Sequence, residues 1–218
     1  MALSLVTPPA VEPVSLAEAK AHCRVDITDD DTYLTTLITT ARKRVEEITS
    51  CALINQTWLY AVDDWPGSDT LKLPKSPLSS VTWIKYTDAA GVVTTYSASN
   101  YVVDTYSRPG RVRLKSTSSW PGTTLQELNG FQVQFVAGYG AAGTAVDEQL
   151  RHAILLLIEH WYENRDPVIV TGAMPQRIAM TVDALLTNFR YGGCSDASRG
   201  TAATTIDAAA GDLDAEQL

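Results

Sequence analysis

The chain of 218 residues contains little cysteine, and the cysteines are scattered. Cys23, Cys51 and Cys194 stand far apart and are odd in number. Disulfide-stabilised domains carry an even, closely spaced set, and structural zinc sites need paired cysteines. The sequence therefore predicts neither a disulfide framework nor a cysteine zinc site, and it fits a reducing compartment.

Positive charge and long hydrophobic runs are also scarce. The chain has 17 Lys and Arg against 25 Asp and Glu, a formal net charge of −8, which excludes a generally basic nucleic-acid binder. The longest strongly apolar run, 153–158, is much shorter than the roughly 20 residues that a helix needs to cross a bilayer. We therefore expect no membrane partner. A chain of 218 residues is long enough to bury an apolar core of its own.

Histidine is also scarce. His22, His152 and His160 are the only three, whereas zinc usually takes three or four converging ligands. Nothing marks a nucleophile with a histidine beside it, as acyl-transfer enzymes require. The sequence predicts no catalytic residue, no metal site and no cofactor.

Two helices are predicted near the N-terminus. Ser15 and Glu18 have the spacing of a capping box, in which each side chain bonds the other residue's amide, so a short helix should span about 16–23. A second, amphipathic helix should span about 30–49. Its apolar stripe consists of Leu34, Leu37, Ile38, Ala41, Val45 and Ile48.

From Gln56 the pattern changes to short runs rich in β-branched and aromatic residues, separated by turns that contain Pro and Gly. These runs predict about seven antiparallel strands, at 57–62, 70–73, 80–87, 92–96, 100–104, 111–115 and 131–137. Strands at this spacing are typical of a compact barrel or sandwich. FQVQF alternates cleanly, so one face of that strand should be in contact with solvent.

The helical period returns after residue 146. Asp147 can cap a helix with two apolar stripes. The first consists of Leu150, Ile154, Leu157 and Trp161, and the second of Leu155, Ile158 and Tyr162. A helix this apolar is buried on more than one side, either in its own domain or against another copy. A last helix should span about 175–191. Residues 192–218 are rich in Ala, Thr, Gly and Asp and contain few large apolar residues.

The predicted fold is α+β: a small helical domain, built from both ends of the chain, with an antiparallel β barrel or sandwich inserted between them. We expect an N-terminal arm and helices at 1–54, the β module at 55–140, the C-terminal helices at 141–191 and an extended tail at 192–218.

Three local patterns carry alternative interpretations. Gly138, Gly140 and Gly143 spell GxGxxG, but the surrounding order does not fit a dinucleotide fold, so we interpret them as a flexible domain junction. Arg42-Lys43-Arg44 is best explained as a salt-bridged helix face. Trp58, Trp65, Trp83 and Trp120 in the β module are best explained as core and turn packing, although aromatics of this kind also bind sugars.

The order of several segments resembles a known family. Six segments follow one another as in the tailed-phage head-tail connectors: SLAEAKAHCRVD, DDDTYLTTLITTARKRVEEITSCALINQTW, LPKSPLSSVTWIKYTDAAG, YVVDTYSRPGRVRL, VQFVAGYG and LRHAILLLIEHWYENRDPV. The similarity is closest to the gp6-like or gp8-like adaptors that carry a β insert, and it extends to about residue 191.

The resemblance implies a non-enzymatic structural protein of the virion neck, made in the host cytoplasm. It implies a homo-oligomeric ring, commonly a dodecamer, that docks under the portal protein, extends the DNA channel and provides a platform for the next neck, stopper or tail protein. Contact with the genome would be transient and non-specific. The alternative is a virion carbohydrate-binding module that uses the β-domain tryptophans.

Two sets of residues are predicted to make the contacts of such a ring. The subunit interface is predicted at Leu155, Ile158, Tyr162 and Arg165, on the doubly apolar helix. The portal-docking tail is predicted to use Tyr191, Ile206, Leu213 and Leu218, because connector C-termini commonly reach the portal.

Overall fold

The computed structural model describes residues 1–164 and 182–190. Its helices are α1 (Leu16–Cys23), α2 (Asp31–Thr49) and α3 (Glu148–Glu163), with short 3₁₀ turns η1 (Ala98–Asn100), η2 (Gly143–Ala145) and η3 (Thr187–Phe189). Its strands are β1 (Ala2–Thr7), β2 (Gln56–Val62), β3 (Thr70–Lys72), β4 (Leu78–Thr87), β5 (Val93–Tyr96), β6 (Tyr101–Asp104), β7 (Arg111–Leu114) and β8 (Phe131–Ala137).

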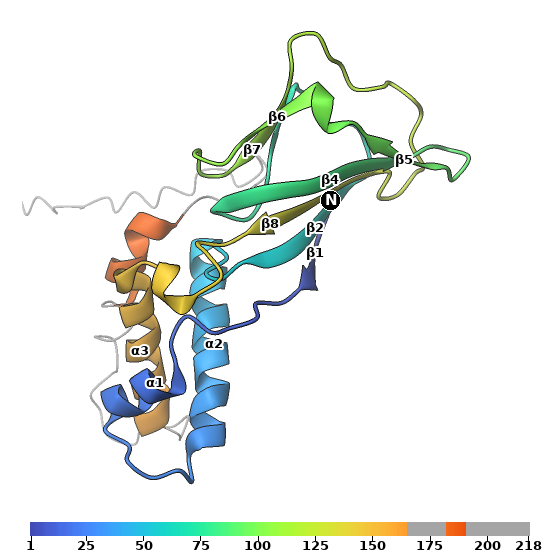
Figure 1. Cartoon of the computed structure of the whole chain (residues 1–218). Helices are drawn as coiled ribbons and strands as arrows, with labels where there is room; N and C mark the ends of the chain where they lie inside the picture. Colours follow the sequence, from blue (N-terminus) through green and yellow to red (C-terminus); the bar gives the residue numbers. More distant parts are fainter. Residues whose placement is uncertain (165–181, 191–218) are drawn as a thin grey trace, which may run out of the picture.

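The helices gather at one end of the molecule and the strands at the other (Figure 1). All seven strands predicted from the sequence are present, within a few residues of the expected bounds. The α+β class is thus confirmed. The C-terminal helix predicted at 175–191 is described only in part: residues 182–186 are helical and lead into η3, and its ends lie outside the described residues.

The helix starts follow the chemistry that the sequence predicts. Ser15 and Glu18 form the capping box of α1, with the Ser15 amide donating to the Glu18 carboxylate at 2.8 Å. This bond is the largest cause of the lowered pKa of Glu18. Asp147 caps α3 by accepting from the Gln149 amide at 2.9 Å. Each cap satisfies a backbone donor that the first helical turn leaves without a partner.

The helices share one apolar core. Leu34 and Ile38 of α2 pack with Leu150, Ile154 and Ile158 of α3, and Ala19 of α1 completes the contact. This cluster is the helical core expected from the two ends of the chain.

The strands form two antiparallel sheets. The larger has the order β1-β2-β8-β4-β5 and the smaller has the order β3-β7-β6. A second apolar core lies between them, with Phe131, Val133 and Phe135 of β8 against Val112 and Leu114 of β7. This core is separate from the helical one.

Neither sheet closes into a barrel within the described residues, so the barrel option of the prediction is not supported. Closure requires the first and last strands to pair, whereas β1 and β5 stand at opposite edges of the large sheet. The strands of the small sheet have only three or four residues each. The arrangement is an open two-sheet packing.

Strand β1 was not predicted, and it places the first residues of the predicted 1–54 segment in the large sheet instead of the helical domain. Ala2–Thr7 pair antiparallel with β2, from Ala2 opposite Ala61 to Thr7 opposite Thr57. The first residues of the chain therefore extend the large sheet, and the arm then runs past α2 to reach α1 (Figure 1). The alternation of Leu3 and Leu5 was the sequence signal, next to Pro8 and Pro9, which end the strand.

A substitution in the helical core tests this packing. Ile154→Ala should lower the free energy of unfolding by about 2–5 kcal/mol, because the Ile154 side chain is fully buried and its removal leaves a cavity. Val102→Ala is the control, since Val102 is 55% exposed and should cost less than about 0.5 kcal/mol. Urea unfolding followed by circular dichroism measures both, and equal effects would contradict the assignment.

Candidate functional site: the junction between helices and sheets

Three segments join the helical part to the sheets: the arm from β1 to α1, and two linkers that lie against each other. One linker leads from α2 to β2 and the other from β8 to α3. The Asn55 amide donates to the Gly140 carbonyl at 2.9 Å, and the Tyr139 amide donates to the Leu53 carbonyl at 3.2 Å. Because each linker bonds the other's backbone, the two parts of the molecule are held in one orientation.

The GxGxxG residues lie at this junction, and they make it tight rather than flexible. Gly138 has a φ of +152°, and a Cβ there would lie 2.4 Å from the Asn55 nitrogen. A Cβ on Gly143 would lie 2.7 Å from the Pro13 carbonyl oxygen. The glycines thus allow close backbone approach, and the expectation of a flexible junction was wrong.

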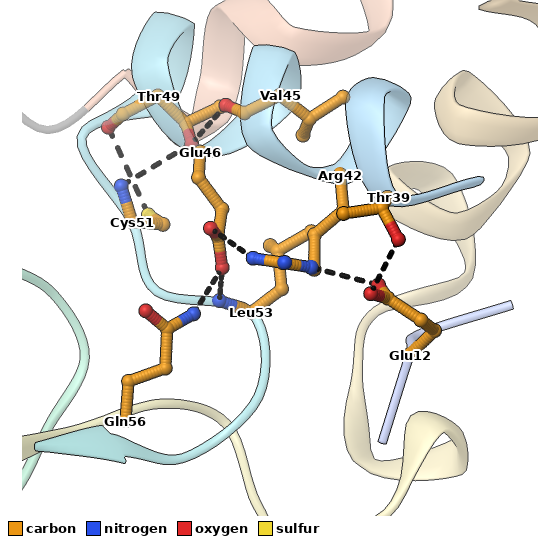
Figure 2. Close-up of polar contacts among 9 residues, drawn as sticks. All are labelled: Glu12, Thr39, Arg42, Val45, Glu46, Thr49, Cys51, Leu53 and Gln56. Atoms are coloured by element: carbon orange, nitrogen blue, oxygen red, sulfur yellow. Dashed lines mark hydrogen bonds and ion pairs between the residues drawn. The ribbon is translucent and has the colours of Figure 1, made fainter. Parts of the chain in front are cut away.

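A buried ion-pair network reinforces the junction (Figure 2). The Arg42 guanidinium on α2 donates to Glu12 of the arm at 2.7 Å and to Glu46 at 2.8 Å. Arg42 is 6% exposed and Glu46 is 7% exposed. Charges this deep are stable only when they are paired and hydrogen-bonded.

The second Glu46 oxygen extends the network to the β module. It accepts from the Leu53 amide at 2.9 Å and from the Gln56 side-chain amide at 2.6 Å. Thr39 donates to the other Glu12 oxygen at 3.0 Å. Arm, helix, linker and the first residue of β2 therefore meet at one pair of carboxylates (Figure 2).

The network was missed in the sequence, where Arg42-Lys43-Arg44 was interpreted as a salt-bridged surface. That interpretation holds for Arg44, which is paired with Glu47 and exposed, but not for Arg42. A signal was present, because Arg42 follows Ala41 and Glu46 follows Val45 within the apolar stripe. Opposite charges at i and i+4 can pair on one face of a helix, and this pair borders the apolar stripe.

A groove of about 610 Å³ borders the network. Leu5, Pro8 and Trp58 contribute apolar surface, and Lys43 and Lys75 contribute positive charge. Burial lowers the pKa of Lys75, whose ammonium lies 5.1 Å from the centre of the Trp58 ring. The groove carries no set of groups arranged for acid-base or nucleophilic chemistry.

The predicted interface residues divide into three cases. Ile158 is fully buried in the chain's own helical core, so it is not available to a neighbour, and that prediction was wrong. Leu155 is partly buried against the core, and the Tyr162 hydroxyl donates to Asp30 at 2.6 Å. Arg165 lies outside the described residues, as do the tail residues Tyr191, Ile206, Leu213 and Leu218.

The histidines form no metal site in the described part of the chain. His22 approaches Glu159 at 3.1 Å and the edge of the His152 ring. No group of three or more His, Cys, Asp or Glu there could hold a metal ion. In the same residues, no helix has the length and apolarity that crossing a membrane requires.

The tryptophans do not form a single sugar platform. Trp65 and Trp120 stack on each other and contact Phe131 in the core between the sheets. Trp58 lies opposite Phe135 of β8, whereas Trp83 lies opposite Gln134. Adjacent residues of a strand point to opposite faces, so Trp58 and Trp83 lie on opposite faces. Their arrangement favours packing over sugar binding.

Comparison with known protein families gives one match. Residues 13–107 match the family model of phage gp6-like head-tail connector proteins. Among curated protein sequences, none matches the chain.

Solved structures extend the match beyond that region. The neck of an empty gene transfer agent (GTA) particle, computed with C6 symmetry, contains a chain that is 28% identical, with a TM-score of 0.73. The match covers 87% of this chain and 95% of the other. Two further matches come from the virion of the native GTA particle, with 28% identity and a TM-score of 0.71, and from its neck computed with C12 symmetry, with 27% identity and a TM-score of 0.68. Each of these also covers 87% of this chain and 95% of the other.

The class of the protein follows from these matches together with the fold: it is a structural connector of a phage-like particle and not an enzyme. More particularly, residues 13–107 are similar to the gp6-like head-tail connector proteins.

Removal of the central charge tests the network. Arg42→Met should lower the free energy of unfolding by about 3–5 kcal/mol, because it leaves Glu46 buried without its counter-charge. Arg44→Met is the matched control on the same helix, and loss of its exposed pair should cost about 0–1 kcal/mol. Equal losses in urea unfolding would contradict the role of Arg42.

The close approach at Gly138 gives a second test. Gly138→Ala should destabilise the protein by roughly 1–3 kcal/mol or more, because the new Cβ needs a strained φ and overlaps the Asn55 backbone. Gly67→Ala is the control, since a Cβ there meets nothing within 4 Å. Thermal unfolding of the two variants measures the difference, and an unchanged melting temperature for Gly138→Ala would argue against a packed junction.

Proposed function

We propose that this chain is a structural adaptor of the virion neck, which forms a ring under the portal protein. The ring extends the DNA channel and offers a docking platform for the next neck, stopper or tail protein. The observation that carries the proposal is the match over 87% of the chain to a protein in the neck of a GTA particle. The symmetric necks of that particle support a ring of copies.

The junction suits a protein with a mechanical role, which holds two partners in a fixed arrangement, better than it suits a catalyst. A neck adaptor must hold its contacts to two partners at a fixed distance and angle while DNA passes. The backbone hydrogen bonds between the two linkers and the Arg42 network fix the helices relative to the sheets. The net charge of −8 is consistent with a channel wall that does not grip DNA phosphates.

Two contact sets stay proposals. Leu155 and Tyr162 of α3 are the retained candidates for the subunit interface, without Ile158 and with Arg165 as a further candidate. Residues 192–218, with Tyr191 just before them, are proposed to reach the portal through Ile206, Leu213 and Leu218.

Loss of the gene tests the function. Particles produced without this chain should be DNA-filled heads that lack tails, alongside free tails, because the connection between them is missing. Negative-stain electron microscopy scores the particles, and the full chain supplied in trans should restore tailed particles. A chain ending at residue 190 should fold but fail to restore them, if the tail docks on the portal.

Tailed particles of normal number without the chain would contradict the adaptor role. Normal complementation by the shortened chain would contradict only the proposed role of the tail.

A further inference from the structure

Strand β1 is an edge strand with no covering element in the described part of the chain. All six residues of Ala2–Thr7 are exposed, and Leu3, Leu5 and Val6 are 38%, 46% and 50% exposed. The strand carries no charge and no proline. Natural edge strands usually carry such protection because a bare row of backbone donors and acceptors pairs readily with another chain.

The opposite edge of the same sheet has the same character. Val93–Tyr96 form β5, which pairs only with β4 among the described strands. Its first three residues are exposed, with Val93 at 61%, and it too lacks charge and proline. The large sheet therefore ends in two open, uncharged edges.

The two edges are suited to each other in a ring. Copies related by rotation meet through two different surfaces of the same chain, which must lie on opposite sides of each copy. Neighbouring strands of the large sheet are all antiparallel, so the first and fifth strands run in the same direction. A head-to-tail join would therefore pair β5 and β1 as parallel strands.

We propose that β1 of one copy pairs with β5 of the next, so that the large sheets of neighbouring copies join side by side around the ring. This inference rests on the proposed function, because it takes the partner to be a second copy of this chain in a ring. The join would satisfy the backbone groups of both edges and bury Leu3, Leu5, Val6 and Val93.

The sheet register provides a stringent cross-linking test. Ser4 lies opposite Leu59, which lies opposite Gln134, and Thr95 lies opposite Lys85, which lies opposite Gln132. Because Gln132 and Gln134 share a face, Ser4 and Thr95 share it as well. Thr94 is opposite Tyr86 and Phe131, on the other face.

Paired cysteines introduced at these positions should distinguish the two faces. Ser4→Cys combined with Thr95→Cys, or with Val93→Cys to allow the other register, should give a ladder of disulfide-linked species when purified particles are oxidised. Ser4→Cys with Thr94→Cys is the matched control and should give none, because the two thiols lie on opposite faces. The single variants measure the background from the three native cysteines.

A second measurement does not depend on register. Leu5→Lys and Val93→Lys place charges on the two edges and should abolish incorporation of the chain into particles, while the far-ultraviolet circular dichroism spectrum and the melting temperature stay unchanged. Val102→Lys is the control, because Val102 is 55% exposed on β6, an edge strand of the small sheet. It should be incorporated normally.

The outcomes separate this inference from the proposed function. If the chain is present in particles but neither same-face pair cross-links above the single variants, the β1–β5 join is wrong and the adaptor role stands. Dimers formed by Ser4→Cys alone would indicate β1–β1 pairing and would also overturn it. Absence of the unsubstituted chain from particles would contradict the proposed function, and this inference with it.

Discussion

The Arg42 guanidinium lies between two carboxylates, and the orientation of the helices relative to the sheets depends on that arrangement. Glu12 brings in the N-terminal arm, while Glu46 reaches the linker and β2 through Leu53 and Gln56. Without these bonds, the two separate apolar cores would be connected only by the arm and by the two linkers with their backbone hydrogen bonds. A buried charge network is a weak source of net stability, but its directional bonds join the arm, α2, the linker and β2 in one arrangement.

The two ends of the molecule then serve different contacts. The helical end carries the residues proposed to face a neighbour and leads toward the tail proposed to reach the portal. The sheet end carries two open edges. Because the junction is rigid, a ring formed through either end would place the other end at a fixed angle, which suits a platform on which further neck proteins assemble.

Much of this fold could be predicted from the sequence because its signals are local. The capping box at Ser15 and Glu18, the cap at Asp147 and the seven β-rich runs depend on residues close together in the chain, and the structure confirms them. The family resemblance, which rested on the order of several segments, was also confirmed.

What the sequence did not reveal depends on contacts between distant residues. Strand β1 pairs with β2, some fifty positions away, and Arg42 bonds Glu12, which is 30 positions away. Gly138 was predicted to lie in a flexible junction, whereas the Asn55 backbone packs closely against it. Ile158 was predicted to lie in the subunit interface but is enclosed by the chain's own core.

The central claim is that this chain sits between head and tail. Immunogold electron microscopy of particles that contain it, with antibodies against the β module, tests that claim most directly. The account predicts gold at the head-tail junction of every labelled particle. Gold on fibres or at the tail tip, or no label on particles despite good expression, would contradict it.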